Sequence, residues 1–207
     1  MRKLAAALKA KGIVPQEPIT VFGSAPLQLA VDPLILSGDI DISVSDHNER
    51  IKEIIEEIGF AKGKADYYIE VVPRYVFRPG ENWLGRANIV ELEGVQFRIP
   101  DPLDILLAKL RRLDVKDLRA FEAVRRKVGR PTEEEFVSEL RASADIFYIQ
   151  KDGQKSVLWE NTEKLWLQFF GKPIDVRETI LKPVIDAIAE QNGDVEYIRE
   201  LRDRLGL

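Results

Sequence analysis

The sequence lacks cysteine and contains a single histidine among its 207 residues. Without cysteine, disulfide bonds, thiolate zinc sites and cysteine nucleophiles are excluded. One histidine argues against a histidine-rich metal centre and against a catalytic triad built on histidine. Any metal ion must therefore be bound mainly by carboxylate oxygens.

Long hydrophobic runs are also missing. The N-terminal stretch MRKLAAALKAKG has an apolar run that is too short, and too interrupted by lysine, for a secretory signal or a membrane span. We therefore expect a cytoplasmic protein with no membrane contact. An apolar content of 45% over this length is enough for one compact unit or for a core domain with a small appendage.

Charge is unevenly distributed along the chain. The formal net charge of −4 gives no general argument for nucleic-acid binding. Basic residues nevertheless outnumber acidic ones between Lys109 and Arg130. We expect a local positive surface there.

The spacing of apolar residues predicts an α+β fold. Strands are expected at 18–22, 39–44 and 67–72, with a hairpin of 88–92 and 95–99 around Glu93-Gly94, and helices at 2–10, from Ser24 and at 48–59. From Asp101 the pattern is helical, with capping signals at Asp101-Pro102, Asp114 and Thr132–Glu135. We predict a core of a small mixed sheet flanked by helices over 1–130, followed by a helical region over 131–207.

Two aspartates share one face of a predicted strand. In Asp39-Ile-Asp41-Ile-Ser-Val44 polar and apolar residues alternate, so Asp39 and Asp41 point the same way while the isoleucines point to the core. Like charges this close repel unless a cation lies between them. An oxygen-only pair suits Mg²⁺. The alternative is a solvated strand face with incidental acids.

A glycine-serine turn precedes a helix upstream of the acids. Backbone N–H groups at a helix start, with a hydroxyl beside them, form a cradle for anions, and Gly23 lets a phosphate approach the backbone. The alternative for Gly23 and Ser24 is an ordinary turn and helix cap.

Together the two elements resemble the signature of the DNA-polymerase-β-like nucleotidyltransferases, a Gly-Ser turn followed after a helix by an Asp-x-Asp strand. The resemblance implies transfer of a nucleoside monophosphate from a nucleoside triphosphate to an acceptor hydroxyl, with Mg²⁺ or Mn²⁺ held by Asp39, Asp41 and a third acid. Glu70 matches that third position, and Asp66 is the reserve candidate. Two departures are the fourteen residues between Ser24 and Asp39 and the proline at position 26.

The stretch from Ile99 to Asp117 resembles abortive-infection-type nucleotidyltransferases, including toxins of toxin–antitoxin pairs. The resemblance implies that Lys109 and Lys116 contact the triphosphate and that Asp117 assists proton removal or positioning. It also implies RNA, such as tRNA, or protein as the acceptor, and an antitoxin as a partner. The alternatives are a solvated basic helix face for the lysines and a cap partner of Asp114 for Asp117.

Two rival functions remain at this stage. The first is a non-catalytic binding protein that keeps the fold, which the long connection between Ser24 and Asp39 and the proline at position 26 slightly favour. The second is an adenylyltransferase that acts on a small molecule. The basic stretch from Lys109 to Arg130 favours a polyanionic acceptor over a small cationic one.

Overall fold

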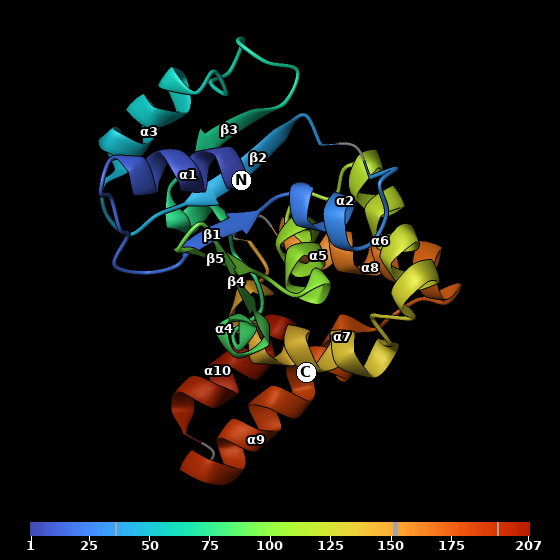
Figure 1. The fold of residues 1–207 in the computed structure, drawn as a ribbon. Coiled ribbons are helices and arrows are strands. Elements are labelled where there is room, and N and C mark those ends of the chain that lie inside the picture. Colours follow the sequence, from blue (N-terminus) through green and yellow to red (C-terminus); the bar gives the residue numbers. More distant parts are fainter. Residues whose placement is uncertain (36, 151–152, 194) are drawn as a thin grey trace. The chain divides into compact units, whose positions relative to one another are not determined.

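A computed structural model describes residues 1–35, 37–150, 153–193 and 195–207, except for the side chains of residues 146 and 192. The chain forms two compact units (Figure 1). The core unit comprises Met1–Ala108 and Arg119–Val128, and the helical unit comprises Lys109–Leu118 and Gly129–Leu207. Residues 109–118 were expected from the sequence to belong to the core, but they group with the helical unit.

The core unit is built on one five-stranded mixed sheet with the order β3-β2-β1-β5-β4. Strand β1 pairs antiparallel with β2 and parallel with β5, β2 pairs parallel with β3, and β4 pairs antiparallel with β5. The strands are β1 (Ile19–Phe22), β2 (Asp39–Ser43), β3 (Tyr68–Val71), β4 (Asn88–Leu92) and β5 (Val95–Ile99). The predicted mixed sheet and the hairpin are confirmed.

Two helices cover one face of this sheet. Helix α1 (Arg2–Ala10) and helix α3 (Asn48–Glu57) lie side by side over it (Figure 1). Each presents apolar residues three or four positions apart, which places them on one side of the helix. The resulting core consists of side chains from α1, from α3 and from the inward face of the strands: Leu4, Ala5, Leu8, Ile51, Ile54, Ile55, Ile19, Val21, Ile42, Ile69, Val95 and Phe97.

Aromatic rings cover part of the opposite face of the sheet. The segment after β3 contains η1 (Arg74–Val76) and α4 (Trp83–Arg86). Phe77 from this segment stacks on Phe22 of β1 with ring centroids 4.9 Å apart, and Trp83 meets the Phe77 ring edge-on at 5.3 Å. The outward-facing Phe22 is therefore buried as well, and this second apolar layer holds the segment against the sheet.

A buried ion pair fixes the same segment at its end. Arg86 donates two hydrogen bonds to the fully buried carboxylate of Asp104, from Nε to Oδ2 at 2.9 Å and from a terminal nitrogen to Oδ1 at 2.6 Å. Asp104 lies in the first turn of α5 (Pro102–Leu110). The bidentate geometry ties α4 to the start of α5.

The long connection between α2 (Ala25–Ala30) and β2 is anchored by a buried acid. Asp32 accepts a hydrogen bond from the Leu34 N–H at 3.0 Å and pairs with Lys127 at 3.1 Å, near the end of α6 (Val115–Val128). The Leu34 hydrogen bond is the largest cause that lowers the pKa of Asp32, and Lys127 and Arg126 lower the pKa further against the effect of burial. Asp32 thus ties the start of this connection to the end of α6 within the core unit.

Helices make up most of the helical unit, as predicted. The capping box expected at Thr132–Glu135 is present: the Glu135 N–H donates to the Thr132 hydroxyl at 3.2 Å, and the Thr132 N–H donates to Glu135 at 2.9 Å. Besides the end of α5 and the start of α6, the helical unit contains α7 (Glu133–Ala142), η2 (Ala144–Ile146), α8 (Val157–Phe170), η3 (Arg177–Leu181), α9 (Lys182–Asn192) and α10 (Glu196–Leu205). The α+β class is confirmed. No helix among the described residues has the length and apolarity that crossing a membrane requires.

Candidate active site

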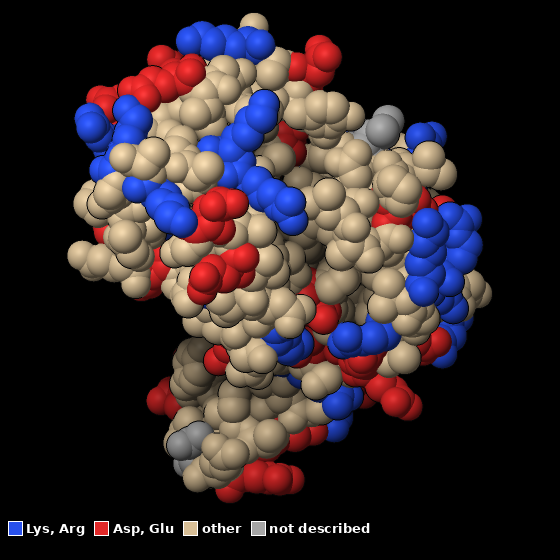
Figure 2. Space-filling model, viewed as in Figure 1, with Lys and Arg blue, Asp and Glu red and all other residues tan. Residues whose placement is uncertain are grey.

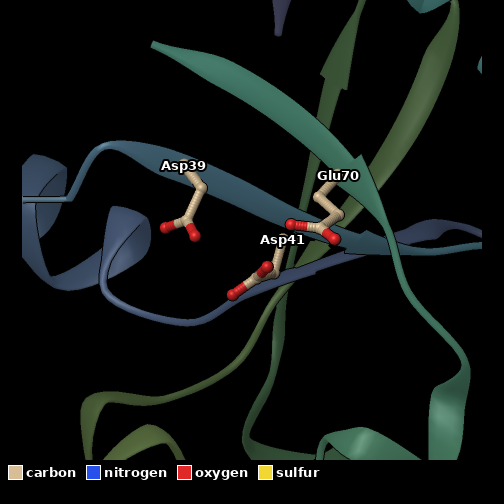
Figure 3. Close-up of side chains that lie close together, drawn as sticks. All are labelled: Asp39, Asp41 and Glu70. Carbon is tan, nitrogen blue, oxygen red and sulfur yellow. The ribbon is translucent and has the colours of Figure 1, made fainter. Parts of the chain in front are cut away.

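Strand β2 delivers two carboxylates to one face of the sheet. Ile42 is fully buried among the core side chains and Ile40 packs against them, so Asp39 and Asp41 point to the opposite face. Figure 3 shows both carboxylates projecting from the same side of the strand. The period-two prediction for this strand is therefore confirmed.

Strand β3 supplies the third carboxylate. It runs parallel to β2, and Glu70 lies directly beside Asp41 in the register of the pair. One ligand oxygen from each of Asp39, Asp41 and Glu70 lies within 4.8 Å of the other two, and all three residues are half-buried. The structure thus gathers the three acids named from the sequence (Figure 3).

The chemistry of this donor set fits a hard divalent cation. Three carboxylates this close repel one another, and a cation between them removes that cost. Mg²⁺ prefers oxygen ligands and usually combines one or two carboxylates with water and phosphate oxygens. Asp39, Asp41 and Glu70 are therefore the residues that could hold such a cation.

The reserve candidate for the third acid lies outside this cluster. Asp66 precedes β3 instead of belonging to it, and its side chain is exposed. Residues 61–67 form turns and bends between α3 and β3, so the alternation that would place Asp66 on the face of Glu70 does not extend that far. Glu70 is the acid that the strand pairing brings to the aspartates.

Gly23 follows β1 immediately and passes against Asp41. Its φ of +75° lies in the left-handed region that glycine adopts most easily. A Cβ at this position would collide with Oδ2 of Asp41 and lie 3.3 Å from its Cγ. A side chain at this position would therefore adopt a strained backbone angle and would displace the Asp41 carboxylate.

Ser24 and the short helix after it form the other part of the predicted phosphate cradle. Ser24 is the N-cap residue of α2, but its own backbone is helical and its side chain makes no capping hydrogen bond. Pro26 lies in the first turn, as expected. Whether Gly23 and Ser24 bind phosphate stays a prediction.

Lys109 and Asp117 meet within the helical unit. Asp117 is fully buried and Lys109 is 6% exposed, and the Lys109 ammonium donates to Asp117 Oδ1 at 2.8 Å. Oδ2 of Asp117 accepts hydrogen bonds from Arg112 Nε and from the Asp114 N–H, both at 3.1 Å. The capping alternative for Asp117 is thus present, and the same carboxylate also ties the end of α5 to the start of α6.

Lys116 is exposed on the first turn of α6, next to that buried pair. The roles that the resemblance implies for Lys109, Lys116 and Asp117 at the nucleotide stay predictions. The structure adds that Lys109 and Asp117 already have a structural role, because each neutralises the buried charge of the other.

Basic side chains gather along the core unit's part of α6 (Figure 2). Arg119, Arg125, Arg126 and Lys127 are all exposed. Lys127 and Arg126 also lie 3.1 and 3.6 Å from Asp32, so part of this charge is offset locally. A positive surface on this helix was predicted from the sequence.

A family model described as "Nucleotidyltransferase of unknown function (DUF6036)" matches residues 3–156, which is most of the chain and includes all three acids. The chain belongs to this nucleotidyltransferase family. No curated protein and no solved structure matches it. The membership agrees with the superfamily expected from the glycine-serine turn and the Asp-x-Asp strand, whereas a closer relation to abortive-infection or toxin–antitoxin members stays an expectation.

The close approach of Gly23 to Asp41 predicts a separable effect on metal binding. Gly23→Ala should lower the free energy of unfolding by at least the roughly 1–2 kcal/mol that the left-handed angle costs a non-glycine residue, and it should also displace the Asp41 carboxylate and weaken Mn²⁺ binding. Gly59→Ala is the matched control, because Gly59 has a φ of +77° and open space where its Cβ would lie. Melting curves measure the stability of both variants, and Mn²⁺ titrations measure their metal affinity. Equal metal affinities in the two variants would contradict the close approach of Gly23 to Asp41.

The buried pair of the helical unit predicts a pH-dependent stability. Burial raises the pKa of Asp117, but the hydrogen bonds and charges of Arg112 and Lys109 outweigh it and lower the pKa below its usual value. Asp117 thus stabilises the fold fully above the unfolded-state pKa of about 4, and this contribution is lost as the pH falls through the lower folded-state pKa.

We expect Asp117→Asn to lower the free energy of unfolding at pH 7 by about 3 kcal/mol, because it leaves the buried Lys109 without its counter-charge. The loss of stability on acidification from pH 5 to 2 should be smaller in this variant than in the wild type. Asp114→Asn is the control, since Asp114 is 55% exposed and lies 3.6 Å from Arg112. Denaturant unfolding across this pH range measures the free energy of unfolding of each variant. If it falls equally steeply with pH in the wild type and in Asp117→Asn, Asp117 is not the source of the pH dependence.

Proposed function

We propose that this protein transfers a nucleoside monophosphate from a nucleoside triphosphate to an acceptor hydroxyl, with Mg²⁺ or Mn²⁺ held by Asp39, Asp41 and Glu70. The observation that carries the proposal is the convergence of the three carboxylates from two paired strands, within 4.8 Å of one another. Membership of a nucleotidyltransferase family supports the reaction class.

The chain's own residues would act mainly by positioning. Asp41 and Glu70 are direct neighbours across β2 and β3 and Asp39 lies one pair further along, so a metal-bound triphosphate would meet a preformed row of acids. A metal ion held by Asp39, Asp41 and Glu70 would neutralise the negative charge that gathers on the reacting phosphate and on the leaving pyrophosphate. Gly23 leaves room for the Asp41 carboxylate at the end of β1, and with Ser24 it is our candidate for holding the phosphates.

The acceptor class is proposed from charge and from the resemblance. The exposed basic residues of α6 favour a polyanionic acceptor such as tRNA, with a protein hydroxyl as the other candidate. An antitoxin-type protein partner is proposed on the resemblance alone.

Label transfer from the four α-³²P nucleoside triphosphates tests the proposal directly. Each nucleotide is incubated with Mg²⁺ and with total tRNA, a protein extract or a mixture of small hydroxyl compounds. We expect label from one nucleotide to appear in one macromolecular acceptor. Label only in a small compound would support the adenylyltransferase rival, and no transfer, together with no binding of any nucleotide, would support a non-catalytic binding protein.

A mutational asymmetry follows from the geometry of the acids. Asp39→Asn and Asp41→Asn each remove a negative ligand without changing the side-chain shape, so transfer should fall by about two orders of magnitude or more, as expected when a ligand of a catalytic metal is lost. The melting temperature should stay the same or rise, because repulsion on the strand face is relieved.

Asp66→Asn is the matched control, since Asp66 is an acid from the neighbouring segment that lies outside the cluster. It should retain full transfer activity. The assignment fails if Asp39→Asn and Asp41→Asn unfold the protein while the folded fraction still transfers label at the wild-type rate.

A further inference from the structure

Two hydroxyl groups contact the Asp39 carboxylate from outside the acidic cluster. Ser37 Oγ lies 3.2 Å from Asp39 Oδ1 and 2.7 Å from the Asp39 backbone oxygen. The Tyr68 hydroxyl lies 3.5 Å from Asp39 Oδ2, so it makes a long hydrogen bond. The single proton of the Ser37 hydroxyl is shared between the Asp39 backbone oxygen and Oδ1, with the backbone oxygen closer, and the Tyr68 hydroxyl lies beside Oδ2.

The two hydroxyls are themselves held in place. Ser37 is 8% exposed, and its short contact with the Asp39 backbone oxygen fixes the hydroxyl at the start of β2. Tyr68 is the partner of Asp39 in the register of β2 and β3, so its side chain leaves the sheet on the face of the acids. The Lys62 ammonium lies 5.5 Å from the centre of the Tyr68 ring and packs against it.

Asp39 needs such support more than a surface aspartate does. Repulsion from Asp41 on the same face favours rotamers that turn the Asp39 carboxylate away from the cluster. Hydroxyl donors oppose that rotation without adding a positive charge. A lysine or arginine in their place would also hold the carboxylate, but its charge would compete with a metal ion for the same oxygens.

We propose that Ser37 and Tyr68 are positioning residues that hold the Asp39 carboxylate in the metal-binding geometry before the ion arrives. Each carboxylate oxygen has two lone pairs, so accepting one hydroxyl still leaves one lone pair for the metal. The inference rests on the proposed function, because it assumes that Asp39 is a metal ligand. Groups that orient metal ligands in this way commonly contribute a factor of ten or more in metal affinity.

A Mn²⁺ titration of the nucleotide-free protein tests the positioning role without any activity measurement. Binding is monitored as the loss of the electron paramagnetic resonance signal of free Mn²⁺. Ser37→Ala should weaken Mn²⁺ binding about tenfold, and Ser37→Thr, which keeps the hydroxyl, should restore most of the affinity. Tyr68→Phe keeps the ring and should weaken binding less, because its hydrogen bond is longer. Ser45→Ala is the control, since the Ser45 hydroxyl contacts Asp46, an acid outside the cluster, at 3.1 Å.

Melting temperatures are measured for every variant, and an affinity is compared only where the variant is folded. If Ser37→Ala and Tyr68→Phe bind Mn²⁺ as tightly as the wild type while Asp39→Asn does not, the positioning role is wrong and the metal site stands. If Ser37→Thr is as weak as Ser37→Ala while remaining folded, the hydroxyl is not the group that matters and the inference is also wrong. If the wild type itself binds no Mn²⁺, both the inference and the proposed metal site fall.

Discussion

The candidate site depends on the alternation of β2, which is apolar on one face and acidic on the other. Ile42 is fully buried and Ile40 packs beside it under the layer of α1 and α3, so Asp39 and Asp41 must project from the other face. A slip of one residue in the pairing of this strand would place both carboxylates in the core, at a cost of several kcal/mol for each buried charge. The apolar face thus fixes the register, and the register fixes where the acids lie.

The local parts of this arrangement follow from the sequence. The period-two pattern of 39–44 predicted the face that Asp39 and Asp41 share, and the capping signal at Thr132–Glu135 predicted the start of a helix. Both features are local: the residues that form the sequence pattern are themselves the residues of the strand face or of the capping box. Glu70 was chosen from the resemblance, and its direct pairing with Asp41 needed the structure, because the sequence does not state which strands become neighbours.

Contacts between distant residues could not be predicted in the same way. The glycine-serine turn was noted for phosphate binding, but nothing in the sequence showed that Gly23 would lie against the carboxylate of Asp41, eighteen positions later. Nor did the sequence show that the Ser37 hydroxyl would contact the Asp39 carboxylate, although a hydroxyl two residues before an Asp-x-Asp strand could have served as a signal. For Asp117 the sequence left two interpretations, a role at the nucleotide implied by the resemblance and a cap partner of Asp114. The structure adds a buried lysine as its partner, which raises the expected cost of its removal.

The buried pair of Lys109 and Asp117 and the cluster of three acids differ in what they contribute to stability. Asp117 and Lys109 neutralise each other in a buried position, so removing either leaves a buried charge. Asp39, Asp41 and Glu70 have the same sign and repel, so their proximity opposes folding slightly, and the proposed cation would remove that cost. Asp117 therefore stabilises the fold because its charged neighbour is a lysine, whereas the three acids of the cluster destabilise it slightly because their charged neighbours are acids.

The claim that these three acids form a metal-dependent nucleotide site is tested most directly by calorimetry with ATP, GTP, CTP and UTP, each with and without Mg²⁺. The phosphates complete the coordination of a metal that the acids hold only in part, so at least one nucleotide should bind much more tightly with Mg²⁺ than without it. That gain should disappear in Asp41→Asn. Binding of every nucleotide that is indifferent to Mg²⁺, or a metal-dependent gain that persists unchanged in Asp41→Asn, would contradict the claim.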